Sequence, residues 1–570
     1  MRRLTFKIRG PLDIVAFEDK PALSVIPLGG IGEIGLNSTV FEYGDDMILV
    51  DCGIMFPDES MLGVDIVIPD FTYLLENREK LRGILITHGH EDHTGALPYL
   101  LKELNVPVYG TRLTLGLIKS KLEEHGLDEK VELIPVRPRD KVKLGVFDVE
   151  FIRVTHSIVD GVGLGIKTPV GNVVHTGDFK IDPTPVDGEL LDFHLFSQYG
   201  REGVLLLMSD STNATKGGFT FSEKEVRRAF EDIFSKAKKR IIIATFASNI
   251  HRVQQAIDVA QMYGRKVILN GRSMVNNARI AAELGYLNIP EGMWRRLEDL
   301  KNMPEEEVVI ITTGSQGEPM SAMDRMAMDE HKQIKVHAGD TVILSAKVIP
   351  GNEKSIARII NHLFMRGADV IYEKTSEIHV SGHASKEELK LMLNIVKPKF
   401  FIPVHGEYRH LISHANLAKK VGIPEDNIFI LKDGDVVELT EDSAAKRGFV
   451  TAGRVFIDGK GVGDVGDMVL RDRMKLASDG VVIVIIGLEK LTGKLLTGPD
   501  IISRGFVFED ASQELYGEVK DLVGDLLLNM TAETKSEWSL VQASVRSALK
   551  KFIKKKMDRL PMILPIIIEI

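Results

Sequence analysis

The feature that most constrains this chain is a short apolar segment that runs directly into a cluster of metal-binding side chains. Residues 83–87, Gly-Ile-Leu-Ile-Thr, have the composition of a buried strand. The next six residues, His88-Gly-His90-Glu-Asp92-His93, contain three histidines and two carboxylates. Because imidazole and carboxylate ligands together suit Zn²⁺ or Mn²⁺, this turn predicts a metal site rather than a solvated polar loop. Alternate side chains of such a turn can serve two metal centres.

Further ligand candidates follow other predicted strands. His156 follows one apolar run, Asp178 ends the sequence His-Thr-Gly-Asp, and His405 lies in Pro-Val-His-Gly-Glu. Each of them alone also has a structural interpretation, as a hydrogen-bonded histidine at a strand end or as a turn aspartate. Together with the cluster at 88–93 they predict one site that is built at the ends of several strands.

The composition is that of a soluble globular protein without a global basic surface. The chain has 570 residues, so about two to four domains are expected. Charged residues make up 27% and hydrophobic residues 44%, which is an ordinary balance. Because the net charge is −9, any nucleic-acid site must be a local basic groove or must rely on metal ions.

Several sequence features bear on the compartment. The only cysteine, Cys52, excludes a disulfide framework within the chain and favours a reducing compartment. The N-terminal segment 1–7 is basic, but no apolar signal region follows it. The longest apolar runs, 481–488 and 560–570, are far shorter than the roughly 20 residues of a membrane-spanning helix. We therefore expect a cytoplasmic protein.

The strand and helix patterns change along the chain. Up to about residue 200, short β-branched runs cut by Gly and Asp predict a strand-rich layer. From about residue 221 strands and helices alternate, as in a doubly wound α/β domain. Short β-branched runs like those of the first 200 residues return at Val370–Ile371. After about residue 450 a glycine-rich stretch precedes a small α+β region. The predicted segments are 1–220, 221–369, 370–450, a linker at 451–475, and 476–570.

Two predicted helices carry informative faces. The sequence Ser222-Glu-Lys-Glu predicts a capped helix with Val226, Phe230 and Phe234 on one face. A C-terminal helix combines an apolar stripe with a basic face, which we interpret first as a solvated surface and otherwise as a nucleic-acid or subunit contact. The stripe is Val545, Leu549, Ile553 and Met557, and the basic face is Arg546, Lys550, Lys551, Lys554, Lys555, Lys556 and Arg559.

A glycine motif near the N-terminus invites a different interpretation. Gly30-Ile-Gly32-Glu-Ile-Gly35 matches the dinucleotide-binding pattern G-x-G-x-x-G. Such a site requires a helix that opens at the third glycine. Residues 37–43 and 47–50 are strand-like instead, so we reject a dinucleotide site. We expect the glycines to let the backbone pass close to the active site.

At each ligand motif the sequence resembles the metallo-β-lactamase superfamily. Histidine rather than glutamate at position 90 argues against the flavo-diiron branch. Nearly 200 residues lie between Asp210 and His405. This insertion resembles the β-CASP cap of nucleic-acid hydrolases, whose marker residues are matched by Asp210, His383 and His405. The segments 246–251, 271–274 and 379–383 and the C-terminal region resemble the ribonuclease J group, so that the resemblance covers essentially the whole chain.

The resemblance implies an α/β fold. This is a metallo-β-lactamase αββα sandwich, split by an inserted β-CASP α/β domain and followed by a small α+β C-terminal domain. It also implies a centre with two Zn²⁺ ions, or with Mn²⁺ or Mg²⁺. The implied ligands are His88, His90 and His156 for one ion, Asp92, His93 and His405 for the other, and Asp178 as the bridge between them.

The same resemblance assigns catalytic and supporting roles. Asp92, Asp178 and His383 would be catalytic, with His383 protonating the leaving oxygen. Asp51, in Val-Asp-Cys-Gly, and Asp210 would support the metal ligands from behind.

The segment 379–383 suits a phosphate by its own chemistry. The Ser381 hydroxyl, the Gly382 N–H and two imidazoles form a compact set of donors for an oxyanion. For His379 a purely structural role at a strand end is the alternative. The resemblance adds RNA-backbone contacts by His379, Val380, Ser381, Gly382 and His383 and by Ser248, Asn249 and Ile250.

The resemblance further suggests a structural Ca²⁺ near Gly63, Asp65 and Asp458. Carboxylates are suitable hard donors for this ion. Two aspartates in loops are also ordinary turn residues, and the sequence alone leaves both interpretations open.

The implied function is a ribonuclease with endonuclease and 5′→3′ exonuclease activity that favours 5′-monophosphate ends and takes part in rRNA maturation and mRNA decay. Expected partners are the RNA substrate, further copies of the chain in a homodimer or homotetramer, and proteins of an RNA-degradation complex, with no membrane contact. The alternatives are a DNA nuclease of the same superfamily and a non-catalytic RNA-binding subunit, which the complete set of ligand positions argues against. The long cap disfavours a small-molecule hydrolase.

Overall fold

The computed structural model describes residues 21–318, 320–348, 352–373, 378–459, 461–489, 494–506, 513–531, 534–535 and 537–570. The first 20 residues of the predicted segment 1–220 therefore lie outside the described part. The chain divides into two compact units. One comprises the residues up to Phe56 together with Val67–Val455, and the other comprises Pro57–Ile66 together with Phe456–Ile570.

Two sheets pack face to face in the first unit and form the inner layers of a sandwich. The first sheet consists, in spatial order, of β23 (Ala444–Phe449), β22 (Asp435–Leu439), β1 (Leu23–Gly29), β3 (Ser38–Tyr43), β4 (Asp46–Val50), β6 (Leu81–Leu85), β7 (Val108–Gly110) and β8 (Leu133–Pro135). The second consists of β20 (Phe400–Val404), β13 (Val204–Asp210), β12 (Gly171–His175), β11 (Val162–Thr168), β10 (Phe147–Arg153) and β9 (Lys141–Leu144). Phe41 and Val50 of the first sheet share one buried core with Phe151 and Leu164 of the second.

Helices cover the outer faces of this sandwich. On the second sheet lie α5 (Phe193–Glu202), α11 (Lys386–Val396) and α12 (Tyr408–Lys420), whose apolar residues form one buried cluster with those of β10, β12 and β13. On the first sheet α4 (Arg112–Glu124) contacts β7 and β8, and α3 (Leu97–Glu103) packs beside it. The predicted αββα arrangement is confirmed.

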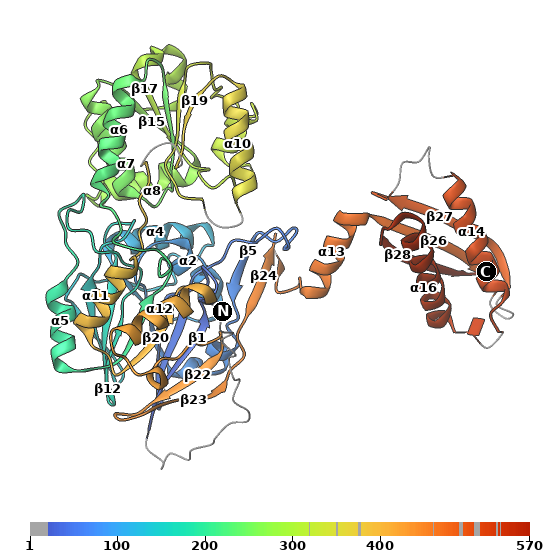
Figure 1. The fold of residues 1–570 in the computed structure, drawn as a ribbon, viewed down its shortest axis with the longest axis horizontal. Coiled ribbons are helices and arrows are strands. Elements are labelled where there is room, and N and C mark those ends of the chain that lie inside the picture. The colour runs from blue at the N-terminus through green and yellow to red at the C-terminus, as the bar shows by residue number, and fades with distance from the viewer. Residues whose placement is uncertain are drawn as a thin grey trace, which may run out of the picture. The chain divides into compact units, whose positions relative to one another are not determined.

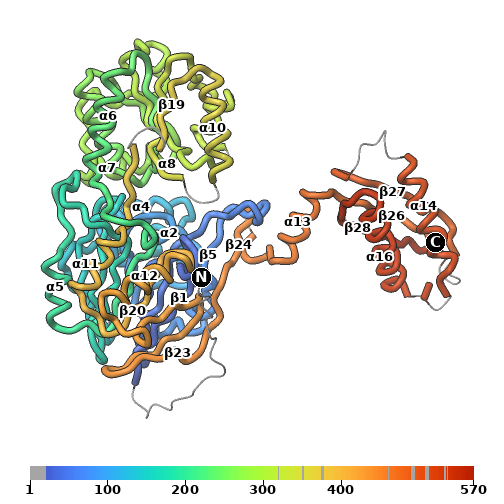
Figure 2. Tube along the Cα trace, in the orientation of Figure 1, coloured from blue at the N-terminus to red at the C-terminus, as the bar shows by residue number. Residues whose placement is uncertain are grey.

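The sandwich is interrupted by an inserted domain with a sheet of its own (Figure 1). All neighbouring strands in it are parallel: β16 (Trp294–Arg295), β15 (Lys266–Asn270), β17 (Val308–Thr312), β14 (Ile241–Ala244), β18 (Thr341–Leu344) and β19 (Asp369–Ile371). In Figure 2 the chain passes from the blue and cyan sandwich into this green and yellow domain and returns in orange. The apolar runs of β14 and β17 are buried throughout, as expected of parallel strands with both faces covered.

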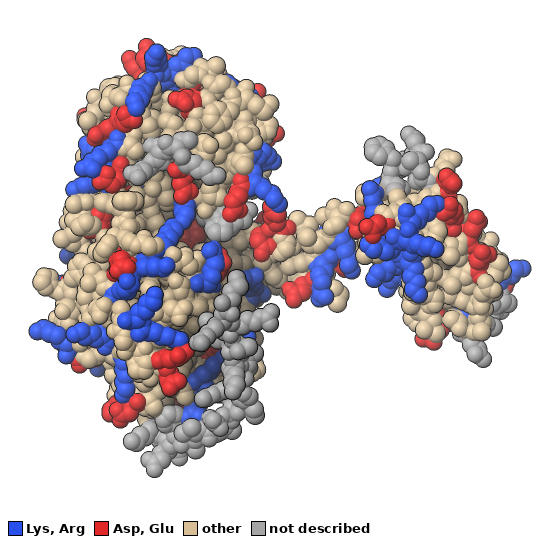
Figure 3. Space-filling view, in the orientation of Figure 1, with Lys and Arg blue, Asp and Glu red and all other residues tan. Residues whose placement is uncertain are grey.

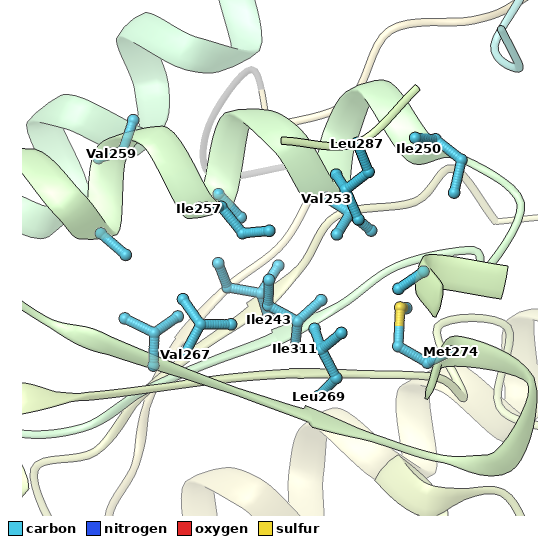
Figure 4. Packing of buried hydrophobic residues seen from close by; sticks show 14 of the residues in the cluster. Ile243, Ile250, Val253, Ile257, Val259, Val267, Leu269, Met274, Leu287 and Ile311 are labelled. Atoms are coloured by element: carbon cyan, nitrogen blue, oxygen red, sulfur yellow. The ribbon is translucent and has the colours of Figure 1, made fainter. Parts of the chain in front are cut away.

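Helices lie on both faces of the inserted sheet. One face is covered by α6 (Lys224–Lys236), α7 (Ile250–Met262) and α8 (Arg272–Glu283), and the other by α9 (Ala322–Ala327) and α10 (Glu353–Met365). Figure 4 shows Val253 and Ile257 of α7 facing Ile243, Val267 and Ile311 of the sheet. The doubly wound α/β pattern predicted for this region is therefore confirmed.

The strand at Val370–Ile371 lies elsewhere than predicted. It belongs to β19, which pairs with β18 in the inserted sheet, with Val370 opposite Val342. A short β-branched run has the same composition in either sheet, so only its hydrogen-bonding partner identifies it. The predicted domain boundaries themselves stay predictions.

The first helix of the inserted domain also begins later than its sequence suggested. Glu223 rather than Ser222 precedes α6, and its side chain makes no capping hydrogen bond, although Ser222 Oγ accepts from the Lys224 N–H at 3.3 Å. The predicted apolar face is confirmed, since Val226, Phe230 and Phe234 are all buried.

The second unit contains a sheet in the order β27 (Leu495–Arg504), β26 (Val481–Leu488) and β28 (Met562–Glu569). The helices α14 (Gln513–Leu528) and α16 (Trp538–Met557) pack on one face of it and form a single apolar cluster with β26. The apolar run 501–508 lies in β27 only up to Arg504, and residues 507–508 lie outside the described residues. The strand β28 was not predicted, because Pro565 argues against a central strand, but an edge strand tolerates proline.

Part of the predicted linker has regular structure. It contains β24 (Arg454–Asp458), β25 (Gly461–Val462) and the first residues of α13 (Asp467–Asp479). Ile457 pairs with Val462, so part of the glycine-rich sequence lies in paired strands rather than in a free connection.

The C-terminal helix has the apolar and basic faces predicted for it, and the interpretation of the basic face stays a prediction. Val545, Leu549 and Ile553 of α16 are buried, whereas its lysines and arginines are exposed. Lys554 pairs with Asp558 at 2.5 Å. Among the described residues no helix is both long and apolar enough to cross a bilayer.

Candidate metal centre

The predicted ligands follow strand ends of both sheets of the sandwich. Asp51 follows β4, His156 lies beyond β10, Asp178 lies beyond β12, and His405 follows β20. The parallel strands β4 and β6, and likewise β12, β13 and β20, bring their carboxyl ends to the same edge of each sheet. Asp51 and His405 have φ angles of 61° and 53°, a conformation that is costly for residues other than glycine and is typical of functional sites.

The glycine-rich segment passes beside this edge. β2 (Ile31–Gly32) pairs in parallel with β21 (Gly406–Glu407), directly after His405, and the His405 N–H donates to the Gly30 carbonyl at 3.0 Å. No helix opens at Gly35, so the dinucleotide site is excluded and the expected close passage of backbone is confirmed.

The first group of donors consists of His88, His90 and His156. The Nδ1 atom of His90 lies 3.0 Å from His88 Nε2 and 3.2 Å from His156 Nε2. A tetrahedral zinc ion with Zn–N bonds of about 2.0–2.1 Å holds its nitrogen ligands roughly 3.3 Å apart. Burial lowers the pKa of His88 and His156 well below the usual value and that of His90 to about 4, so the rings are neutral and can donate lone pairs. The group therefore fits a metal ion.

The second group consists of Asp92, His93, Asp178 and His405, whose ligand atoms lie within 4.8 Å of one another. The Oδ2 atom of Asp178 lies 3.3 Å from His93 Nε2 and 3.4 Å from His405 Nε2. The same oxygen lies 3.8 Å from His88 Nε2 and 3.7 Å from His156 Nε2. Burial would raise the pKa of Asp178, but His405 and His93 hold it well below its usual value. One ionised carboxylate therefore faces both groups.

Buried polar side chains orient the ligands. The Asp51 carboxylate contacts His93 Nδ1 at 2.7 Å and accepts from the Thr87 N–H at 2.8 Å. Asn37 contacts His405 Nδ1 at 2.9 Å through its Oδ1 atom and donates to the Asp92 carbonyl at 3.0 Å. The Nε2 atoms of both histidines lie within 3.4 Å of Asp178 Oδ2, and that of His93 also lies 3.1 Å from Asn37 Nδ2.

His383 lies beside the centre with its own carboxylate partner. Its Nδ1 atom is 2.8 Å from Asp210 Oδ2 and 3.9 Å from Asp178 Oδ2. Burial would lower the pKa of His383, but Asp210 raises it to about 9. The geometry suits a protonated imidazole that is oriented by Asp210.

The loop His379–His383 is fixed against the centre. Gly382 accepts from His156 Nδ1 at 2.7 Å, and a side chain at position 382 would meet the His156 ring at 2.6 Å. Asn213 donates to Ser381 Oγ at 2.7 Å and to the His383 carbonyl at 2.9 Å. The predicted phosphate segment and the predicted metal ligand His156 are thus in direct contact.

His379 has a different environment from His383. Burial and the Arg252 guanidinium lower its pKa to about 3, and its Nδ1 atom is buried without a hydrogen-bond partner in the described residues. The other predicted RNA contacts, Ser248, Asn249 and Ile250, lie at the start of α7, where Asn249 Oδ1 accepts from the Arg252 N–H at 3.0 Å.

Four family models match the chain. The model of the metallo-beta-lactamase superfamily matches residues 31–243, and that of the ribonuclease J beta-CASP domain matches residues 238–363. The model of the Zn-dependent metallo-hydrolase RNA specificity domain matches residues 368–430, and that of the ribonuclease J C-terminal domain matches residues 468–570.

Similar full-length proteins decide the family. The chain is 45% identical to a ribonuclease J of Thermus thermophilus over 558 residues, which cover 96% of this chain and 95% of that protein. It is 45% identical to a ribonuclease J of Synechocystis, covering 95% of this chain and 86% of that protein. For ribonuclease J2 of Bacillus subtilis the identity is 43%, over 96% of this chain and 98% of that protein. The chain belongs to the ribonuclease J family.

The fold of this ribonuclease J family member also occurs in a distant solved structure. A protein of unknown function from Enterococcus faecalis matches 73% of this chain and 100% of its own, with a TM-score of 0.53 and 16% identity. This likeness shows the fold alone.

The two aspartates predicted to hold calcium make other contacts in this structure. The Asp458 carboxylate pairs with Arg473 at 2.5 Å, and Asp65 accepts from the Gly459 N–H at 2.8 Å. Arg473 also donates to the Leu62 carbonyl at 2.8 Å. A guanidinium therefore neutralises Asp458 in this structure, and the calcium site stays a prediction.

Sequence reasoning missed some residues of the centre. Asn37 contacts three predicted ligand residues, Asp92, His93 and His405, but carries no distinctive sequence signal, since an asparagine after a glycine turn is common. Asn213 could have been noticed in Asp210-Ser-Thr-Asn213, because it follows a marker residue closely, although nothing in the sequence names Ser381 as its partner.

Proposed function

We propose that this chain hydrolyses phosphodiester bonds in RNA, both internally and from the 5′ end, at a centre that holds two metal ions. The observation that carries the proposal is the position of Asp178 Oδ2 between two separate groups of imidazoles, within 3.8 Å of a nitrogen from each. Family membership and the RNA specificity model support RNA as the substrate.

Zinc is the proposed ion, with Mn²⁺ or Mg²⁺ as alternatives. His88, His90 and His156 would hold one ion, Asp92, His93 and His405 the other, and Asp178 would bridge them. Two bound ions lower the pKa of a water and neutralise charge at phosphorus. Asp51 and Asn37 keep the ring nitrogens of His93 and His405 directed at the centre.

His383 is proposed to protonate the leaving oxygen. Asp210 binds its Nδ1 atom, so the Nε2 atom is the one available to the substrate. The Asp210 carboxylate also keeps the ring protonated, since it raises the pKa of His383 to about 9 against the effect of burial. Asp92 and Asp178 complete the proposed catalytic set.

RNA backbone contacts are proposed for two segments, Ser248–Ile250 and His379–His383. The second adjoins the metal ligand His156 through Gly382. The N–H and hydroxyl donors of the segment His379–His383 would form a pocket beside the centre. This pocket would receive a 5′-monophosphate and exclude the bulkier triphosphate. Roles in rRNA maturation and mRNA decay, and contacts with other RNA-degradation proteins, are part of the same proposal.

We also infer a homodimer or homotetramer, formed through the C-terminal unit. On the face of its sheet away from α14 and α16, the edge strand β28 exposes Leu564, Ile566 and Ile568 by 40%, 44% and 48%. Such a row of exposed apolar residues is typical of a subunit contact. Light scattering of the wild type and of Ile566→Glu tests this, since a monomeric wild type would contradict it.

The function is tested with purified protein and one RNA that carries a 5′-monophosphate, a 5′-triphosphate or a 5′-hydroxyl. Release of mononucleotides from the monophosphate end, with internal cuts in all three, is expected. Equal cleavage of DNA of the same sequence would support a DNA nuclease of this superfamily. RNA binding without cleavage or bound metal would support a non-catalytic subunit.

A further inference from the structure

A fully buried arginine lies where the inserted domain joins the sandwich. Arg252 is on α7 and has an exposed fraction of 0%. The apolar face of this helix packs on the inserted sheet (Figure 4). Its first residues are the proposed RNA contacts Asn249 and Ile250. A guanidinium in such a place requires partners, because an uncompensated buried charge is costly.

One side of the guanidinium binds the connection that enters the inserted domain. Arg252 Nη2 donates to Glu223 Oε2 at 2.8 Å, and Glu223 immediately precedes α6. Burial alone would raise the pKa of Glu223, but Arg252 and Lys180 hold it at about 2, so the pair is ionised. Lys180 of the sandwich lies 3.8 Å from the other oxygen of Glu223.

The other side of the guanidinium binds the connection that returns to the sandwich. Arg252 Nη1 donates to the Ile378 carbonyl at 2.9 Å and to Ser345 Oγ at 2.6 Å. The Ser345 hydroxyl donates in turn to the same Ile378 carbonyl at 2.6 Å. Ile378 is the residue directly before the loop His379–His383, so two donors fix the start of that loop.

The sandwich fixes the other end of the loop. Glu388 accepts from the N–H groups of Ser385 and Thr220, at 2.8 and 2.7 Å. Thr220 lies in the connection that enters the inserted domain, and Ser385 lies in the connection that returns to the sandwich. Arg252 thus binds the two connections from the inserted domain, and Glu388 binds them from the sandwich. Only Arg252 also lies on the helix that begins with Asn249 and Ile250.

A contribution to the stability of the fold does not by itself explain the buried pair of Arg252 and Glu223. A buried ion pair contributes little net free energy relative to well-packed apolar residues. In addition, Arg252 Nε, Glu223 Oε1 and His379 Nδ1 are buried without hydrogen-bond partners in the described residues. The planar guanidinium does supply two directions of hydrogen bonding at fixed geometry, which a lysine cannot do.

We propose that Arg252 is a positioning residue that sets the distance between the two RNA-contacting segments, Ser248–Ile250 and His379–His383, and thereby the preference for a 5′-phosphate end. This rests on the proposed function. Arg252 does not touch the metal centre, and it acts through Ile378 and through the first turn of α7.

The test compares Arg252→Lys with Arg240→Lys in the full-length protein. Arg240 is a matched control, because it is a buried arginine of the same domain that pairs with Asp340 and donates to the Lys335 carbonyl at 2.8 Å. The first readout is kcat/KM for RNA with a 5′-monophosphate divided by that for RNA with a 5′-hydroxyl. Arg252→Lys should lower this ratio about tenfold, the loss expected for one charged hydrogen bond. Arg240→Lys should leave the ratio unchanged.

A second readout does not depend on catalysis. Amide hydrogen exchange in the peptides 246–252 and 378–385 should become faster in Arg252→Lys and stay as in the wild type in Arg240→Lys. Unchanged exchange in both peptides would overturn the proposal, as would an equal fall of the ratio in both variants. If the wild type shows no end preference, the proposed function fails, and the exchange comparison still decides the positioning role.

Ser345→Ala serves as a milder variant in case Arg252→Lys does not fold. It removes one of the two donors to the Ile378 carbonyl and keeps the Glu223 pair intact. The ratio should fall in the same direction but by less. A wild-type ratio together with wild-type exchange in Ser345→Ala would contradict the proposal.

Discussion

Asp178 is the residue on which both donor groups of the centre depend. It faces His88 and His156 on one side and His93 and His405 on the other, and its carboxylate is buried and ionised. Other carboxylates near the centre have narrower roles. Asp51 binds one histidine from behind, and Asp210 binds His383.

Asp178→Ala should remove the contact between the two groups and leave the fold intact. The rate of RNA cleavage should fall by more than about 100-fold, because even replacing a residue that only hydrogen-bonds to a metal ligand lowers metal affinity or activity by about 10–100-fold. The measurement is turnover together with the circular dichroism spectrum. Asp148→Ala is the control, since this carboxylate is 57% exposed on β10. Near-normal turnover in Asp178→Ala would contradict its assignment as the bridge.

His383→Ala should keep the metal and lose most of the turnover. General acid catalysis contributes roughly 10²–10⁴-fold, and the ring binds Asp210 rather than the imidazole groups. Metal content and the rate are measured on the same sample. If the metal content falls with the rate, His383 is a ligand and the role proposed here is wrong.

At the scale of elements, the loop His379–His383 connects the metal centre with the junction of the two domains. Its Gly382 contacts His156, its Ser381 and His383 contact Asn213, and its start is fixed through Ile378. Internal cleavage places RNA on both sides of the centre and does not need a pocket for a terminal phosphate.

Ser381→Leu should therefore impair exonuclease action more than internal cleavage. The larger side chain would fill the space next to Gly382 and displace the Asn213 contact. Both activities are measured on one long RNA with a 5′-monophosphate. Thr215→Leu, an exposed change of similar size in the neighbouring segment, should affect neither. An equal loss of both activities in Ser381→Leu would count against a terminal pocket.

A buried carboxyl group beside β2, that of Asp433, makes stability depend on pH. It accepts from the Ile31 N–H at 3.1 Å. Burial and the neighbouring Glu33 carboxylate raise the pKa of Asp433 from 3.8 to about 8, while Arg454 pairs with Glu33 at 2.6 Å. A carboxyl with a raised pKa in the folded state stabilises the fold below its unfolded pKa. This contribution is lost progressively as the pH rises towards 8.

The side chain in Asp433→Asn cannot ionise. The melting temperature of this variant minus that of the wild type should therefore increase from about pH 5 to pH 8 and stay constant above pH 8. Asp435→Asn is the matched control, because Asp435 is paired with Lys446 at 2.6 Å and its removal should destabilise the fold without this pH trend. A constant difference between Asp433→Asn and the wild type across this range would refute the assignment.

The centre was more predictable from sequence than the elements that support it. Each ligand stands where an apolar run ends, and the ends of parallel strands meet at one edge, so the sequence alone places His88, His156, Asp178 and His405 together. It does not reveal the partners Asn37 and Arg252, because they act through backbone carbonyls and ring nitrogens that lie far away in sequence. The membership of β19 in the inserted sheet likewise depends on long-range pairing.

At the scale of the whole molecule, the sandwich supplies the ligands and the inserted domain supplies part of the proposed RNA contacts. The net charge of −9 gives no general attraction for RNA. Figure 3 shows lysines and arginines interspersed with acidic side chains over the sandwich and the inserted domain, and gathered into a basic patch on the C-terminal unit. Within the first unit, RNA binding should therefore depend on the centre and on the two contacting segments.

The central claim is a two-metal centre that cuts RNA, and a metal titration tests it most directly. Metal-free protein is titrated with Zn²⁺ or Mn²⁺ while bound ions per chain and cleavage of 5′-monophosphate RNA are measured together. The account predicts two bound ions per chain, with cleavage appearing only as the second ion binds and both lost on chelation. Full cleavage with a single ion per chain, or cleavage that persists after all metal is removed, would contradict it.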